Sequence, residues 1–251
     1  MPKAPPRTDK IRLDELLVWR GLAESRTRAQ ALVLAGVIFA GERRLDKPGA
    51  SVAADAAIEV RGKDHPWVSR GGVKFAHGLD HFRIDPAGLV ALDIGASTGG
   101  FTDVLLSRDA RRVYAVDVGH GQFDWRLRND ARVVLLEKTN ARNLDARLIP
   151  EPLQLIVCDA SFIGLETVLP AALALAASGA RLIALIKPQF EVGKGRVGKK
   201  GVVRDPALHR EVCARIEAWL TARGWRVLGV TESPIVGPEG NKEFLIAAER
   251  E

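Results

Sequence analysis

The chain has 251 residues, of which 47% are hydrophobic and 27% charged, a balance that excludes a disordered or fibrous protein. Its formal net charge of +6 favours a polyanionic partner, although a basic balance can also serve solubility alone. The two cysteines form neither a disulfide framework nor a metal-ligand pattern, and no apolar run approaches the roughly 20 residues of a membrane span. We therefore expect a cytoplasmic protein without a metal site.

The first sixty residues predict a small α+β unit. Leucines recur at helical spacing between Arg12 and Arg20, and Ser25 can cap a second helix that ends at Gly36. Turn residues then separate short strand patterns at 37–40, 43–45 and 57–61. The segments that we expect along the chain are a flexible tail at 1–10, a small domain at 11–62, a linker at 63–72 and a large domain at 73–251.

Basic side chains stand out in this small unit. Arg26 and Arg28 begin the second helix, where cations oppose the helix dipole, a cost that packing alone does not explain. A phosphate partner would explain them, and solvated charges on a helix face are the open alternative. The arginines that we expect to contact a polyanion are Arg12, Arg20, Arg26, Arg28, Arg43 and Arg44.

The segment VALDIGASTGGFTDVLL, residues 90–106, joins an apolar strand pattern to a glycine-rich turn and a helix start. Such a turn lets the backbone approach a ligand closely, and Thr98 or Thr102 can cap the helix. Ser97 stands where the dinucleotide fingerprint has its second glycine, which disfavours a pyrophosphate. Asp117 follows the next strand, about 20 residues beyond the turn, where a ribose diol is usually held. The pattern favours S-adenosylmethionine over an ordinary strand, turn and helix.

Polar side chains also follow strands further along the chain. Asp159 and Lys187 each end an apolar strand pattern, and Glu243 lies beside a third. Because the carboxyl ends of parallel strands line the ligand crevice of open α/β sheets, we expect these side chains at one edge. Lys74 differs, because it lies in an amphipathic helix before the first sheet strand, where a solvated lysine is the ordinary case.

Two resemblances cover nearly the whole chain. Residues 12–52, RLDELLVWRGLAESRTRAQALVLAGVIFAGERRLDKPGASV, are similar to the RNA-binding domain first seen in the fourth small-subunit ribosomal protein. The remainder resembles the TlyA family of ribosomal RNA 2'-O-methyltransferases, also called hemolysin A. The motifs that carry this second resemblance are VSRGGVKF, DIGASTGGFTD, VDVGHGQFDWRLRND, CDASFI, IKPQFEVG and GNKEFLI.

The resemblance implies a fold, a cofactor and a substrate. The fold is α/β, a seven-stranded Rossmann-like class I methyltransferase sheet of the FtsJ type with helices on both faces, preceded by the small α+β RNA-binding domain. The cofactor is S-adenosylmethionine, and the substrate is the ribose of cytidines in small- or large-subunit ribosomal RNA. The cofactor contacts that we expect are Gly95, Ser97, Thr98, Gly99, Gly100, Phe101, Asp117, Asn140 and Asp159.

The resemblance also implies a catalytic tetrad of Lys74, Asp159, Lys187 and Glu243. Methyl transfer to a ribose hydroxyl is an in-line displacement, so the site must align donor and acceptor and release the proton of a very weak acid. A free lysine, with a pKa of about 10.4, is protonated at neutral pH. We hypothesise that Lys187 orients the hydroxyl and stabilises developing negative charge, while the other three set its position and field.

The segment Lys187 to Asp205 carries six basic and two acidic residues with four glycines between them. It predicts a mobile basic flap over an RNA backbone, against the alternative of an ordinary charged loop. Trp67, Phe162 and Phe190 are candidates to stack on an unpaired base, but we expect each in the core. The RNA contacts expected in the flap are Lys194, Arg196, Lys199 and Lys200.

Two other functions stay open. An RNA-binding protein with an inactive methyltransferase fold would not need the intact tetrad. A membrane-active hemolysin would need a membrane span or a strongly amphipathic cationic helix, and the sequence shows neither.

Overall fold

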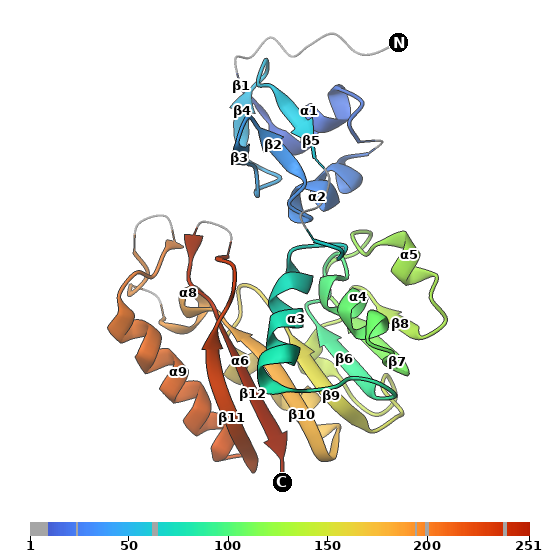
Figure 1. The fold of residues 1–251 in the computed structure, drawn as a ribbon, viewed down its shortest axis with the longest axis vertical. Helices are drawn as coiled ribbons and strands as arrows, with labels where there is room; N and C mark the ends of the chain where they lie inside the picture. The colour runs from blue at the N-terminus through green and yellow to red at the C-terminus, as the bar shows by residue number, and fades with distance from the viewer. Residues whose placement is uncertain (1–9, 24, 62–64, 194, 199–200, 238–239) are drawn as a thin grey trace.

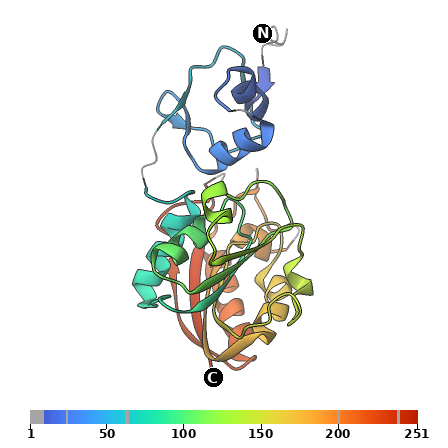
Figure 2. The same cartoon turned by 90° about the vertical axis from the view of Figure 1, so that its right-hand side faces the viewer.

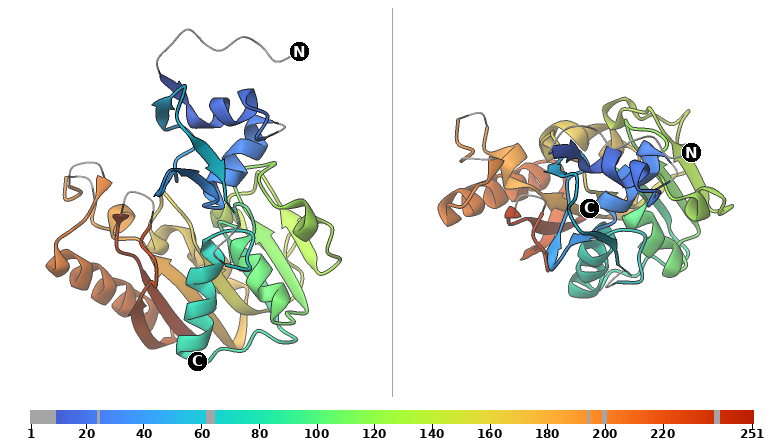
Figure 3. Two further views of the ribbon diagram at one scale, coloured as in Figure 1. Left: turned by 45° about the horizontal axis from the view of Figure 1, so that its top comes forward. Right: turned by 90° about the horizontal axis from the view of Figure 1, so that it is seen from above.

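The computed structural model describes residues 10–23, 25–61, 65–193, 195–198, 201–237 and 240–251. The predicted tail at 1–10 therefore lies outside the described residues, apart from Lys10. The N-terminal part, blue in Figure 1, lies at one end of a larger α/β part, and the view from above shows it over the centre of that part (Figures 1 and 3). Its elements are β1 (Lys10–Arg12), α1 (Leu13–Trp19), α2 (Arg26–Leu34), β2 (Ile38–Ala40), β3 (Arg43–Arg44), β4 (Ser51–Ala53) and β5 (Ile58–Val60).

The N-terminal part has its own core. Helices α1 and α2 pack buried leucine, alanine and valine side chains against β2, and the strand order of its larger sheet is β3-β2-β5. The Ser25 hydroxyl accepts a hydrogen bond from the Arg28 backbone N–H, as predicted for an N-cap. The antiparallel pair of β1 and β4 was not predicted, because three residues are too few to show an alternating pattern.

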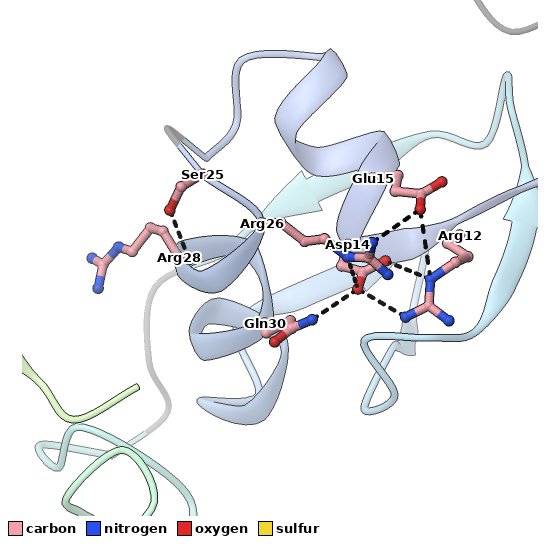
Figure 4. Close-up of polar contacts among 7 residues, drawn as sticks. All are labelled: Arg12, Asp14, Glu15, Ser25, Arg26, Arg28 and Gln30. Carbon is pink, nitrogen blue, oxygen red and sulfur yellow. Dashed lines mark hydrogen bonds and ion pairs between the residues drawn. The ribbon is translucent and has the colours of Figure 1, made fainter. Parts of the chain in front are cut away.

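A buried carboxylate joins the two helices of this part (Figure 4). Asp14 has no exposed surface, and its oxygens accept hydrogen bonds from Arg12 at 2.9 and 3.0 Å, Arg26 at 2.9 Å and Gln30 at 3.0 Å. Burial opposes its ionisation, yet these donors hold the pKa of the carboxyl well below its usual value. Arg12 and Arg26 therefore have a structural role that accounts for their positions without RNA.

The larger part contains a seven-stranded sheet in the order β11-β12-β10-β9-β6-β7-β8. All neighbours are parallel except β12, which runs antiparallel to β10 and β11. Strand order reverses at β6, which pairs with β7 on one side and β9 on the other. The strands are β6 (Val90–Ile94), β7 (Arg112–Val116), β8 (Val133–Leu136), β9 (Leu153–Cys158), β10 (Ala176–Ile186), β11 (Trp225–Glu232) and β12 (Phe244–Arg250).

Helices cover both faces of this sheet, which Figure 2 shows nearly edge-on. One core contains α3 and α4, and the other contains α6, α7 and α9, with alternate strand residues pointing to each. The predicted fold class is therefore confirmed. The helices are α3 (Gly71–Phe82), α4 (Gly100–Ser107), α5 (Trp125–Arg128), α6 (Leu165–Val168), α7 (Pro170–Ala174), α8 (Pro188–Glu191) and α9 (Pro206–Thr221), with a 3-10 turn at Ala141–Asn143.

The turn between β6 and α4 differs from the prediction in one respect. Neither Thr98 nor Thr102 caps α4; instead, the Thr102 N–H and hydroxyl donate to Asp93 Oδ2 at 3.0 and 2.7 Å. Gly95 has φ +80°, and a Cβ there would lie 2.9 Å from the Asp159 carbonyl oxygen. The turn therefore lies directly against the end of β9, which positions both for a shared site.

Within the described ranges, no helix is long and apolar enough to cross a bilayer.

We predict that Asp14→Asn lowers the free energy of unfolding by about 2 kcal/mol at pH 7, because an amide group would face the two guanidinium groups without accepting from both. The depressed pKa of Asp14 makes this stabilisation present above about pH 4 and lost as the pH falls further. Denaturant unfolding measures it. Glu15→Gln is the matched control, since it removes an exposed charge near the same arginines and should cost less than about 0.5 kcal/mol.

Candidate active site

Two adjoining pockets lie at the carboxyl edge of the large sheet. The first, which we call the lysine pocket, has a volume of about 180 Å³ and is lined by Lys74 and Lys187. The second, the Asp117 pocket, has a volume of about 410 Å³. The residues that line both are Gly95, Ser97, Asp159 and Ser161, so the two cavities meet where the glycine-rich turn faces the end of β9.

Lys74 and Glu243 form a buried ion pair. The Lys74 ammonium lies 2.5 Å from Glu243 Oε2, and the side chains are 8% and 1% exposed. Lys74 is the fourth residue of α3, whereas Glu243 directly precedes β12, 169 residues later. Lys74 is therefore a buried site residue and not the solvated lysine that helix position alone suggests.

Lys187 and Asp159 form a second pair at the ends of neighbouring strands. The Lys187 ammonium lies 2.6 Å from Asp159 Oδ1, donates to Ser161 Oγ at 2.9 Å and lies 3.4 Å from the Asp159 carbonyl oxygen. Burial alone would lower the pKa of Lys187, but Asp159 and Glu243 raise it above its usual value. Burial likewise opposes ionisation of Asp159, while Lys187 and Lys74 hold the pKa of its carboxyl below its usual value.

The arrangement determines what Lys187 can do. All four predicted tetrad residues meet, with two ammonium groups facing two carboxylates. A lysine whose pKa is raised keeps its proton at neutral pH, so in this arrangement Lys187 is a hydrogen-bond donor and a positive charge. Among the described residues, no three His, Cys, Asp or Glu side chains form a metal-binding group.

The structure divides the predicted cofactor contacts between the two pockets. Thr98, Gly100 and Phe101 line the lysine pocket, and Asp117 and Asn140 line the other. The carboxylate of Asp117 also accepts from the backbone N–H groups of Ser97 at 2.8 Å and Gly119 at 2.7 Å, which fixes the turn. Gly99 lines neither pocket; a Cβ there would meet Leu127 at 2.5 Å, so its role is close packing.

Asp93 is a buried carboxylate that sequence analysis did not assign to the site. It lines the lysine pocket and is fully shielded from solvent, and its Oδ1 atom has no hydrogen-bond partner among the residues that the structure describes. Burial raises the pKa of this carboxyl to about 7, against the lowering effect of the Thr102 hydrogen bonds. A buried acceptor without a partner is a suitable contact for a cationic ligand group.

Two further residues were missed although their motifs were recognised. Ser161 in CDASFI contacts Lys187, as described above. Asn241 in GNKEFLI is 2% exposed; its side chain accepts from the Val203 N–H and donates to the Gly201 carbonyl oxygen, each at 3.0 Å. Asn241 thereby connects the end of the basic segment to the loop that bears Glu243. An asparagine beside a predicted catalytic glutamate is the signal that could have found it.

The predicted RNA contacts fall into groups. Arg20 and Arg44, like Arg12 and Arg26, have partners within the protein. Arg20 donates to two backbone carbonyl oxygens, and the Arg44 guanidinium lies 3.0 Å from the Asp46 carboxylate. Arg28 and Arg43 are exposed, and neither side chain has a hydrogen bond or ion pair within the described part of the chain. In the predicted flap, Arg196 forms a two-point contact with Glu211 at 2.6 Å. Lys194, Lys199 and Lys200 lie outside the described residues, and 188–191 of this segment form the short helix α8.

The expectation that Phe162 lies in the core is wrong. Its side chain is 90% exposed at the Asp117 pocket, and its ring centroid lies 5.0 Å from that of Phe190. The backbone of Phe162 has φ +67°, a left-handed conformation that the sequence pattern did not indicate. Trp125, the first residue of α5, is 70% exposed.

Comparison with known proteins places this site in a family. Residues 67–250 match the family described as FtsJ-like methyltransferase. The Mycobacterium tuberculosis protein named 16S/23S rRNA (cytidine-2'-O)-methyltransferase TlyA is 47% identical over 94% of this chain and 89% of its own length. Hemolysin A of Brachyspira hyodysenteriae is 37% identical over 94% of this chain and 98% of its own.

Solved structures agree with this assignment. The structure of a "putative hemolysin" from Streptococcus thermophilus has a TM-score of 0.75 and 38% identity, covering 98% of this chain and 90% of that one. A SAM dependent methyltransferase from Aquifex aeolicus shares the fold, with a TM-score of 0.50 and 21% identity over 75% of this chain and 95% of that one. The chain belongs to the FtsJ-like methyltransferase family, in the group that includes TlyA and hemolysin A.

Proposed function

We propose that this protein transfers a methyl group from S-adenosylmethionine to the ribose 2'-hydroxyl of cytidines in ribosomal RNA. The observation that carries the proposal is the buried tetrad of two lysine–carboxylate pairs beside the glycine-rich turn. The names of the TlyA relatives support the choice of substrate. Because ribosomal RNA is the substrate, the reaction would take place in the cytoplasm.

The residues present fit the cofactor. Asp117 and Asn140 offer oxygen atoms in a cavity large enough for a nucleoside, and the unpartnered Asp93 Oδ1 atom offers an acceptor to the cationic methionine end. S-adenosylmethionine has no pyrophosphate, so it does not need the second glycine of the dinucleotide fingerprint, whose place Ser97 takes here. When bound, the cofactor supplies an electrophilic methyl group on a sulfonium. The protein's part is to bring an acceptor oxygen into line with it.

Lys187 positions the acceptor oxygen and stabilises its charge during methyl transfer. Its ammonium donates a hydrogen bond to the acceptor oxygen and stabilises the negative charge that develops there as the new bond forms. Asp159 keeps Lys187 protonated and in place, while Lys74 and Glu243 complete the field around it. Because Lys187 holds its proton, it cannot accept the proton of the hydroxyl. That proton must pass to another acceptor as the oxygen–carbon bond forms, since an oxygen that kept it would become positively charged.

We also propose that residues 11–62 are an RNA-binding domain, 63–72 a linker and 73–251 the methyltransferase domain. The separate core of the N-terminal part supports this division. Arg28 and Arg43, exposed and without an acidic partner in the described ranges, suit phosphate contacts. The exposed ring of Phe162, next to Phe190, suits stacking on an unpaired base at the pocket mouth.

We predict that Lys187→Ala lowers kcat for methyl transfer at least about 100-fold, because it removes the donor that stabilises charge on the oxygen. The measurement is transfer of labelled methyl groups to ribosomal subunits and naked ribosomal RNA, with mapping of alkali-resistant riboses. Affinity for S-adenosylmethionine should change little. Lys242→Ala is the control, since Lys242 is exposed and pairs with Glu232. Cofactor binding without transfer by the unmodified protein would favour an RNA-binding protein with an inactive fold.

We predict that affinity for S-adenosylmethionine rises about eightfold between pH 6 and 7.5 and then levels off. The Asp93 carboxyl has a pKa raised to about 7, and a bound cation favours its ionised form, so binding below pH 7 must displace a proton. Calorimetric titration at several pH values measures this. The Asp93→Asn variant should bind more weakly and with no pH dependence in that range; a variant that keeps the slope would contradict the assignment.

We predict that replacing Arg28 and Arg43 together by alanine weakens RNA binding and reduces the slope of log affinity against log salt by about 2, one for each lost phosphate contact. Binding to a ribosomal RNA fragment at several salt concentrations measures the slope. Arg226→Ala is the control, because Arg226 is also exposed but pairs with Glu249. An unchanged slope in the double variant would remove these two arginines from the interface.

A further inference from the structure

Lys187 has one hydrogen-bond partner that the tetrad does not include. An ammonium has three N–H donors. Ser161 Oγ accepts from one at 2.9 Å and the Asp159 carbonyl oxygen accepts from another at 3.4 Å, while the ammonium lies 2.6 Å from Asp159 Oδ1 as an ion pair. The contact with the neutral Ser161 hydroxyl is the one that an acceptor oxygen can replace without separating the Lys187–Asp159 ion pair.

Ser161 also lies where the acceptor oxygen has to come. It lines both the lysine pocket and the Asp117 pocket, at the junction of the two. The acceptor must contact Lys187 on one side and face the methyl donor on the other, and only this junction adjoins both cavities. Ser161 is itself exposed, so its hydroxyl is accessible from the pocket mouth.

The backbone just before Ser161 is held in place by the neighbouring strand and turn. The Asp159 N–H donates to the Ile94 carbonyl oxygen at 2.9 Å, and the close approach of Gly95 keeps this segment against the glycine-rich turn. Phe162, the next residue, has a left-handed backbone with φ +67° and turns its ring out to solvent. The Ser161 hydroxyl therefore faces Lys187 while the Phe162 ring faces solvent. Rotation about χ1 is enough to move the Ser161 hydroxyl.

We propose that Ser161 is a positioning residue for the ribose 2'-hydroxyl. In the free protein its oxygen occupies the place of the acceptor beside Lys187. When the ribose arrives, Lys187 donates to the 2'-oxygen and Ser161 accepts the hydrogen of the 2'-hydroxyl. These two contacts leave a lone pair of that oxygen directed at the methyl group. The inference rests on the proposed function, because it requires a ribose hydroxyl as the methyl acceptor.

The step balances without a change at Ser161. The bond from the 2'-oxygen to the methyl carbon forms as the bond from sulfur to that carbon breaks, and the sulfonium becomes a neutral sulfide. The proton of the 2'-hydroxyl passes along its hydrogen bond to Ser161, and the Ser161 hydroxyl releases its own proton to solvent water at the open pocket junction. Ser161 is therefore a neutral hydroxyl both before and after the step.

The test compares Ser161→Ala and Ser161→Thr in the full-length protein. The alanine variant should lower kcat about tenfold, the worth of one orienting hydrogen bond, with the KM for RNA and the affinity for S-adenosylmethionine unchanged. The threonine variant keeps the hydroxyl and should recover most of kcat. Ser178→Ala, which removes an exposed hydroxyl from β10, is the matched control. Thermal unfolding checks that the variants fold alike.

The outcomes separate this inference from the proposed function. If the unmodified protein transfers no methyl group to ribose, the proposed function fails. If it does transfer, and the alanine variant has an unchanged kcat or a raised KM alone, the role of Ser161 is overturned. A threonine variant as slow as the alanine variant would also overturn it, because the hydroxyl would then not be the group that matters.

Discussion

The active site depends on keeping four charges buried in mutual contact. A buried ion costs several kcal/mol in lost hydration unless a partner of opposite charge and further hydrogen bonds compensate for it. Lys74 with Glu243, and Lys187 with Asp159, meet that condition in pairs. The four side chains come from α3, from the ends of β9 and β10, and from the residue before β12. The site therefore exists only when the helix, the parallel strands and the antiparallel strand are all assembled. Removing any one of the four side chains leaves a buried charge without its partner.

The same pairing decides the chemistry. An isolated buried lysine would lose its proton and become a base. Here the two carboxylates reverse that effect and raise the pKa of Lys187, so the site holds a fixed positive group beside the place where oxygen becomes nucleophilic. Acceleration must then come from alignment and from the stabilisation of charge, as expected for a displacement whose donor already carries a good leaving group.

The sequence predicted the parts of this site that follow from local pattern. Asp159 and Lys187 end apolar strands, and parallel topology brings such ends together. Lys74 could be assigned only by resemblance, because its partner lies 169 residues away and no local pattern shows that contact. The exposure of Phe162 depends on a left-handed backbone at a non-glycine residue, which composition does not reveal. The contact of Ser161 with Lys187 depends on the same turn.

The arginines of the N-terminal part show a second feature that the sequence could not predict, namely which positive charges are already paired within the protein. Arg12, Arg26 and Arg28 look alike in the sequence. In the structure Asp14 and Glu15 pair with the first two, while the third extends from the start of α2 without a partner in the described ranges (Figure 4). What a polyanion meets is the charge left over after internal pairing. The carboxylate that fixes α1 against α2 therefore also selects which arginines are available, and a stabilising contact in the small core shapes the electrostatic surface beside the active site.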